Sequence, residues 1–165
     1  QMYQTRFFFN TDRVRDHHHH HRTTPCSRMG DIKSQVSSKF GPSTPHGTWV
    51  YCAVQNGKLN MTGSGSDVAS LRSHLEQNKS ECGFALLTIR VTLQDIPDQA
   101  RHVWLQWKGP DASGMKTVKA NQLTQAALEA LAPNHGQLTV TGTSNFNEAT
   151  IIDRWAPGTG SHEID

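Results

Sequence analysis

The chain has 165 residues, which is enough for one domain with its own core and too few for two comfortable cores. Five Arg against two Asp give residues 1–28 a net charge of +3, whereas eleven basic and twelve acidic residues give residues 29–165 a net charge of −1. This nearly neutral body lacks the broad basic surface of a nucleic-acid-binding domain. No apolar run approaches the roughly 18 residues of a membrane-spanning helix, and three Cys without a CxxC pair fit a reducing compartment.

Residues 1–28 show no helical or strand periodicity, and we expect them to be an unstructured leader or upstream sequence outside the folded domain. The triplet Phe7–Phe9 is too short for the apolar region of a signal peptide. The run His17–His21 favours a low-complexity, tag-like tract over a metal site, because consecutive imidazoles impose no fixed ligand geometry. Met29 resembles a natural start, so we expect the domain to occupy residues 29–156.

The folded part is predicted to begin with a short helix, which Asp31 caps and Gly41 ends. Its apolar residues recur every four positions on one face: Ile32, Val36 and Phe40. Strands over 48–54 and 58–62 follow, joined by Asn56-Gly57, the dipeptide most typical of a tight hairpin. Gly63 and Gly65 are expected to end the second strand.

A second helix is predicted after Ser66 or Asp67, one of which caps it. Its apolar residues follow an i, i+3, i+7 pattern: Val68, Leu71 and Leu75. Strands over 84–93 and 101–107 come next, and the short connection over 95–99 indicates that they pair antiparallel. Trp104 and Trp107 lie in the later strand, and we expect both in the core, on the same face of the sheet.

A long helix is predicted from Ser113 or Asp111 to Leu131, and Pro133 ends it. The residues of its inner face are Ala120, Leu123, Ala127, Ala130 and Leu131. A strand over 137–141 follows, and then a last helix that a capping box of Asn145 and Glu148 starts. This helix is expected to bury Phe146, Ala149, Ile152 and Trp155. Residues 157–165 are predicted to be a short tail. The element order predicts an α/β (α+β) fold, with a mixed central sheet of about five strands sandwiched between helices.

The segment from His102 to Gly114, HVWLQWKGPDASG, is similar to the coactosin signature of the actin-depolymerising-factor homology family. That signature is a strand with a Trp, then a Gly, a turn that closes on Ser-Gly, and a long helix. The resemblance covers roughly residues 30–155 and has no gap after Arg101. It implies the cofilin-like and gelsolin-like fold of that family. It also implies a monomeric, non-enzymatic module of the cytoplasm and cytoskeleton that binds the side of filamentous actin without strong severing.

The resemblance further implies two actin-binding surfaces. One is the long helix with the turn before it, and the other combines the connection between strands 84–93 and 101–107 with the C-terminal helix. The residues expected there are Arg101, Lys108, Met115, Lys116, Val118 and Lys119. Met115 and Val118 are the expected apolar anchors, and Lys116 and Lys119 would meet the acidic surface of actin. Arg101 stands at the position of a filament-binding Lys, with its charge kept and its donor geometry changed.

Other interpretations of these residues stay open. Lys116 and Lys119 also fit a solvated helix face, and Arg101 also fits the end of a strand. Met115 and Val118 also fit positions in the core. The acidic residues Asp95 and Asp98 favour an alternative function, a scaffold subunit that keeps the fold and does not bind actin. Convergence of Arg101, Lys116 and Lys119 on one face would favour actin binding. A phosphoinositide partner is a weaker alternative, given the net charge of −1.

The sequence carries no motif for catalysis. It has no Gly-x-Ser-x-Gly elbow and no phosphate-binding Gly-x-x-x-x-Gly-Lys-Ser/Thr loop. Four histidines stand singly, without the spacing of metal ligands: His46, His74, His102 and His135. We therefore predict neither an enzyme nor a cofactor or metal site.

Overall fold

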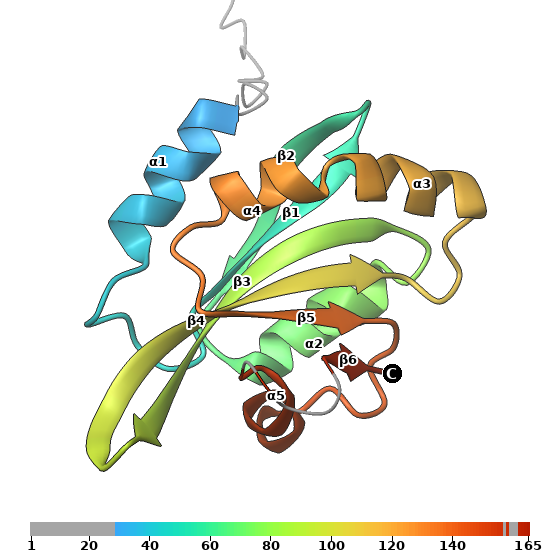
Figure 1. Cartoon of the computed structure of the whole chain (residues 1–165). Coiled ribbons are helices and arrows are strands. Elements are labelled where there is room, and N and C mark those ends of the chain that lie inside the picture. Colours follow the sequence, from blue (N-terminus) through green and yellow to red (C-terminus); the bar gives the residue numbers. More distant parts are fainter. Residues whose placement is uncertain (1–28, 157, 159–161) are drawn as a thin grey trace, which may run out of the picture.

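The computed structural model describes residues 29–156, 158 and 162–165. They form one mixed six-stranded sheet in the order β2-β1-β3-β4-β5-β6, with helices on both faces (Figure 1). The helices are α1 (Met29–Lys39), α2 (Val68–Gln77), α3 (Gly114–Gln122), α4 (Thr124–Ala130) and α5 (Glu148–Arg154). The strands are β1 (Trp49–Gln55), β2 (Lys58–Gly65), β3 (Cys82–Leu93), β4 (Ile96–Lys108), β5 (Gly136–Val140) and β6 (Glu163–Ile164). The predictions for residues 1–28, including the histidine tract, lie outside the described residues.

Strand pairing follows the turns that the sequence predicts. β1 and β2 pair antiparallel around Asn56 and Gly57, whose φ angles of 52° and 71° suit this dipeptide. β3 and β4 pair antiparallel, as predicted, over nearly their whole length. β4 and β5 pair parallel, because α3 and α4 form the crossover between them. β5 and β6 are also parallel, and the sequence did not indicate β6.

The sheet separates two apolar layers. One layer lies under α2 and α5 and contains Trp49, Tyr51, Leu71, Leu105, Trp107 and Ile151. The other lies under α1, α3 and α4 and contains Ile32, Val36, Phe84, Trp104, Ala127 and Leu131. Trp104 and Trp107 are both buried, as expected, but the prediction that they share a face is wrong. They are three residues apart in one strand, and only residues an even number apart share a face.

Two predicted strand boundaries need correction. β2 runs through Gly63 and Gly65 and does not end before them. A Cβ at Gly63 would meet the ring of His74, and one at Gly65 would meet the indole of Trp49. These glycines therefore let two aromatic rings approach the strand closely. β4 also starts earlier than predicted, at Ile96, so the connection to β3 is a tight turn.

The long helix of the prediction is divided at Leu123, where φ is −98° and ψ is 3°. Its predicted inner face is otherwise buried, with Leu123 partly buried. Ser113 is the N-cap, and its hydroxyl accepts a hydrogen bond from the backbone N–H of Lys116 at 3.3 Å. None of the described helices has the length and hydropathy needed to cross a membrane.

The last helix also begins later than predicted. Asn147, and not Asn145, is the N-cap, since its side chain accepts a hydrogen bond from the N–H of Thr150 at 3.0 Å. The helix packs through Ile151, which is buried, whereas Ala149 is exposed and Ile152 is 39% exposed, so the predictions for Ala149 and Ile152 are wrong. The predictions for Phe146 and Trp155 are confirmed, because both are buried.

Candidate functional site

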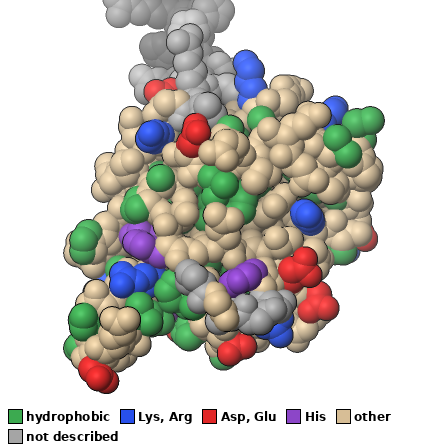
Figure 2. Space-filling view, in the orientation of Figure 1, with side chains coloured by type: hydrophobic (Ala, Val, Ile, Leu, Met, Phe, Trp, Pro, Cys, Tyr) green, Lys and Arg blue, Asp and Glu red, His purple; other side chains and the backbone are tan. Residues whose placement is uncertain are grey.

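The β3–β4 hairpin projects beyond the other strands (Figure 1). Its turn consists of Gln94 and Asp95, with φ angles of 49° and 63°, which is the left-handed conformation of a tight two-residue hairpin turn. Ile96 follows the turn and is 54% exposed, although it is a large apolar residue. In Figure 2, acidic and hydrophobic side chains lie together at the end of this projection. The hairpin tip therefore offers an apolar contact beside a negative charge.

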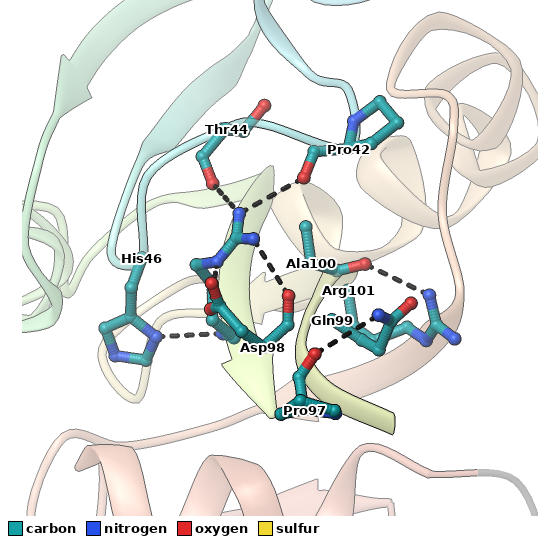
Figure 3. A network of polar contacts seen from close by, with 9 residues as sticks. Pro42, Thr44, His46, Pro97, Asp98, Gln99, Ala100 and Arg101 are labelled. Carbon is teal, nitrogen blue, oxygen red and sulfur yellow. Dashed lines mark hydrogen bonds and ion pairs between the residues drawn. The ribbon is translucent and has the colours of Figure 1, made fainter. Parts of the chain in front are cut away.

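Polar contacts to Pro42, Thr44 and Asp98 fix the base of this hairpin (Figure 3). The residue that makes all of them is Arg90. Its Nε lies 2.5 Å from Oδ1 of Asp98 on β4, and one terminal nitrogen donates to the Asp98 carbonyl at 2.9 Å. The other terminal nitrogen donates to the carbonyl of Thr44 at 2.9 Å and to that of Pro42 at 3.2 Å. The hydrogen bond from Arg90 lowers the pKa of Asp98. One guanidinium thus holds β3, β4 and the α1–β1 loop in a fixed relation.

His46 extends this network to α5. Its Nδ1 accepts the backbone N–H of Arg90 at 2.9 Å, and its Nε2 lies 2.5 Å from Oε1 of Glu148. Glu148 is the first residue of α5. The hairpin and α5 are therefore joined through Arg90, His46 and Glu148. These are the two elements that the sequence resemblance assigns to the filament-side surface. No pattern in the sequence indicated this network, because its members lie far apart in the chain.

The α3 surface carries four of the predicted residues. Met115 and Val118 are 64% and 52% exposed, so their alternative as core residues is wrong. Nζ of Lys116 lies 2.6 Å from Oε1 of Glu81, so a carboxylate already neutralises this ammonium. Lys119 is exposed, and no side chain of the described residues forms a salt bridge with it. It borders a cavity of about 380 Å³ between α3 and the β1–β2 turn. Lys119 is thus the available positive charge beside two apolar side chains.

Lys108 and Arg101 are both partly buried on β4 but lie far from each other. Lys108 pairs with Cys82 at the end of β4 that leads to α3, whereas Arg101 pairs with Ile89 toward the hairpin. They are seven positions apart along the strand, which corresponds to roughly 23 Å. Arg101, Lys116 and Lys119 therefore do not converge on one face. The predicted residues form two groups, one around α3 and one near the base of the hairpin.

Arg101 borders a cavity of about 340 Å³ whose lining includes His102 and His135. The two imidazole rings are 5.2 Å apart. Nδ1 of His102 lies 2.8 Å from the hydroxyl of Thr88, and Nδ1 of His135 accepts the backbone N–H of His102 at 2.9 Å. Burial lowers the pKa of His102 to about 4, and the charges of His135 and Arg101 contribute. Burial, followed by Arg101, also lowers the pKa of His135.

We expect this histidine pair to make the fold less stable in mild acid. An unfolded histidine binds its proton near pH 6.5, above the pKa of either folded residue. The unfolded chain therefore gains protons first as the pH falls from about 6.5 toward 4, and the free energy of unfolding decreases by about 2 kcal/mol. In His135→Asn, Oδ1 replaces the Nδ1 acceptor without titrating. The free energy of unfolding, measured with denaturant between about pH 7 and 5, should decrease less for this variant than for the unmodified chain. An equal decrease of the free energy of unfolding in both chains would contradict this role of the histidine pair.

Comparison with solved structures identifies the fold, whereas no protein-family model and no curated protein matches the sequence. The human coactosin-like protein superposes with a TM-score of 0.63 at 12% identity, over 79% of this chain and 88% of that protein. Coactosin from Entamoeba histolytica superposes with a TM-score of 0.61 at 16% identity, over 73% and 87% of the two chains. Mouse coactosin, an actin filament binding protein, gives 0.51 at 16% identity, over 62% and 70%. The chain therefore has the actin-depolymerising-factor homology fold, as the coactosin resemblance implied.

Proposed function

We propose that this chain binds the side of filamentous actin, as a coactosin-like module with no catalytic activity. The observation that carries the proposal is the network of Arg90, His46 and Glu148, which joins the projecting hairpin to α5. A surface made of two separate elements binds well only if its elements are held in one arrangement before binding. The network supplies that arrangement on a fold shared with mouse coactosin, an actin filament binding protein.

The α3 surface supplies the second contact in this proposal. Met115 and Val118 are exposed on one short helix, as expected for the anchors of a helix that enters an apolar groove. Lys119 stands beside them, where it attracts an acidic partner. Arg101 and Lys108 contribute charge from β4, nearer to the hairpin base and to α3 respectively. The contact is proposed for a monomer, in the cytoplasm and at the cytoskeleton.

The charges of the two surfaces support weak severing as part of this proposal. The hairpin tip carries Asp95 and no Lys or Arg, and Lys116 is paired with Glu81. We infer that the chain decorates filaments and modulates their dynamics without breaking them strongly. These same charges favour the second candidate function, a scaffold that keeps the fold and does not bind actin. They also make a phosphoinositide partner the weaker choice, because an anionic headgroup needs a cluster of free cations.

Fluorescence microscopy of single filaments tests this function. A labelled chain should accumulate evenly along immobilised actin filaments, and the number of filament ends should stay at its value in buffer alone. Binding along the filament with a rising number of ends would contradict weak severing. A chain that stays in solution at tens of micromolar would favour the scaffold function.

A further inference from the structure

The cavity of about 340 Å³ beside Arg101 lies at the base of the projecting hairpin. Its lining comes from β4, from the α1–β1 loop and from the segment between α4 and β5. In Figure 2, a basic side chain and a histidine lie side by side on the surface above the hairpin. The volume lies in the range of small-molecule sites, in which a few polar groups orient the ligand. The donors of Arg101 and His135, which both line the cavity, therefore define what it can bind.

Arg101 contributes a half-buried guanidinium that has no acidic partner. One terminal nitrogen donates to the carbonyl of Ala100 at 3.1 Å, and no carboxylate among the residues that the structure describes forms a salt bridge with it. Asp98 lines the same cavity, but its carboxylate is paired with Arg90, and in Figure 3 the guanidinium of Arg101 points away from Asp98. Nε and the second terminal nitrogen of Arg101 thus keep the fork of donors that matches a carboxylate.

His135 supplies a second donor, whose place on the ring follows from its hydrogen bond. Its Nδ1 accepts the backbone N–H of His102 at 2.9 Å, so the proton of the neutral imidazole is on Nε2. The side chain is exposed, and within the described part of the chain Nε2 has no partner. Burial and then the charge of Arg101 lower the pKa of His135, so the guanidinium lies close to this ring. One small ligand can therefore meet both side chains.

The rest of the lining selects an anion with a single charge and an apolar body. The apolar part of the lining consists of Pro42, Ala100, Pro133 and the buried ring of His102. Both ring nitrogens of His102 are already hydrogen-bonded within the fold, so this ring offers only its apolar surface. One guanidinium compensates one negative charge, which a carboxylate carries, whereas a phosphate monoester carries about 1.5 to 2 at neutral pH.

We propose that this cavity binds a small monocarboxylate with a compact apolar body, whose carboxylate lies between Arg101 and His135. The guanidinium donates to both carboxylate oxygens, and Nε2–H of His135 donates to one of them. The site is complete in the free chain and does not depend on filament binding. Because Arg101 is also part of the proposed filament contact, a bound carboxylate would withdraw its donors from the filament, and only this consequence rests on the proposed function.

The affinity is expected to be modest and to increase as the pH falls. A single bidentate pair that solvent reaches gives a dissociation constant on the order of a millimolar. A carboxylate beside the imidazole favours its protonated form and raises the pKa of His135, so the complex binds more protons than the free chain and forms more readily at about pH 6 than at about pH 7.5. The charged or titratable groups that share the lining with His135 are Arg101, His102 and Asp98, all on β4. His102 stays neutral at these pH values, because burial lowers its pKa to about 4.

Nuclear magnetic resonance of the ¹⁵N-labelled full chain tests the site, with benzoate as the probe and benzamide as an uncharged control of the same shape. At constant ionic strength, benzoate should give saturable shifts of the Arg101 Nε–H and of the His102 amide and should raise the pKa of His135. Benzamide and inorganic phosphate should each bind at least about tenfold more weakly. The proposal is overturned if benzoate gives no saturable shift up to tens of millimolar, or if either control binds as tightly as benzoate.

Matched variants separate this cavity from general attraction of an anion. Arg101→Gln and Arg72→Gln remove the same charge, but Arg72 is exposed on α2, which covers the other face of the sheet. Benzoate should bind about tenfold more weakly to Arg101→Gln and unchanged to Arg72→Gln. His135→Asn keeps an acceptor for the N–H of His102, and in this variant the gain in affinity at lower pH should be lost. Equal benzoate affinity of the two arginine variants, or a gain at lower pH that persists in His135→Asn, overturns the proposed site.

Discussion

Trp107→Ala is expected to lower the free energy of unfolding by about 4 kcal/mol, because the indole fills the layer under α2 and α5. Trp107 is 1% exposed, and its Nε1 donates to the carbonyl of Asn78 at 2.9 Å. Truncation leaves a large cavity and removes one of the two donors to the Asn78 carbonyl, which keeps the backbone N–H of Glu81 at 3.0 Å. This loss is a large part of the roughly 5–15 kcal/mol that stabilises a typical domain.

Denaturant unfolding followed by circular dichroism measures this change, with Ile152→Ala as the control. Ile152 is 39% exposed on α5, so its truncation should change the free energy of unfolding by no more than about 0.5 kcal/mol. Equal losses for both variants would mean that α5 packs through the face that the sequence pattern predicted. A small loss for Trp107→Ala alone would contradict the described core.

Lys119→Glu is expected to weaken filament binding by about 2–3 kcal/mol, which is roughly a hundredfold, if α3 enters an acidic groove of actin. Lys116→Glu should have the smaller effect, because Glu81 already neutralises Lys116. The double variant should bind most weakly. In each case the stability of the fold should change little, since both lysines are exposed.

Lys33→Glu provides the control for net charge, because Lys33 is exposed on α1 and outside both proposed surfaces. It makes the same change in charge as Lys119→Glu and should bind filaments like the unmodified chain. Dissociation constants from fluorescence titration decide the comparison. Similar weakening by Lys33→Glu and Lys119→Glu would show that net charge, and not the α3 surface, governs binding.

The sequence predicted the elements whose pattern depends on neighbours in the chain. The helix with Val68, Leu71 and Leu75, the Asn56-Gly57 hairpin and the antiparallel pairing of β3 with β4 are all confirmed. The coactosin resemblance predicted the fold correctly, although the sequence identity to the three coactosin structures is only 12–16%. Local periodicity and turn chemistry therefore predict most of the helices and strands, but not β6 or the division between α3 and α4.

The predictions were wrong where contacts between distant parts of the chain decide where a strand or helix begins or ends. β2 continues through two glycines because rings from β1 and α2 pack against them. The start of α5 depends on which of two asparagines, Asn145 or Asn147, caps it, and both fit a cap in the sequence. The candidate site was also predicted only where it did not depend on contacts between distant residues. Exposed Met115 and Val118 could be proposed from the resemblance, whereas the network of Arg90, His46 and Glu148 joins residues that lie far apart in the sequence.

Co-sedimentation of the full chain with filamentous actin tests the central claim most directly. The proposed function predicts saturable pelleting with rising filament concentration, and less pelleting at higher salt, because Lys119 contributes through its charge. Chain alone should stay in the supernatant. If the folded chain does not pellet with filaments at tens of micromolar and low salt, it does not bind actin filaments in this range, and the scaffold function replaces filament binding.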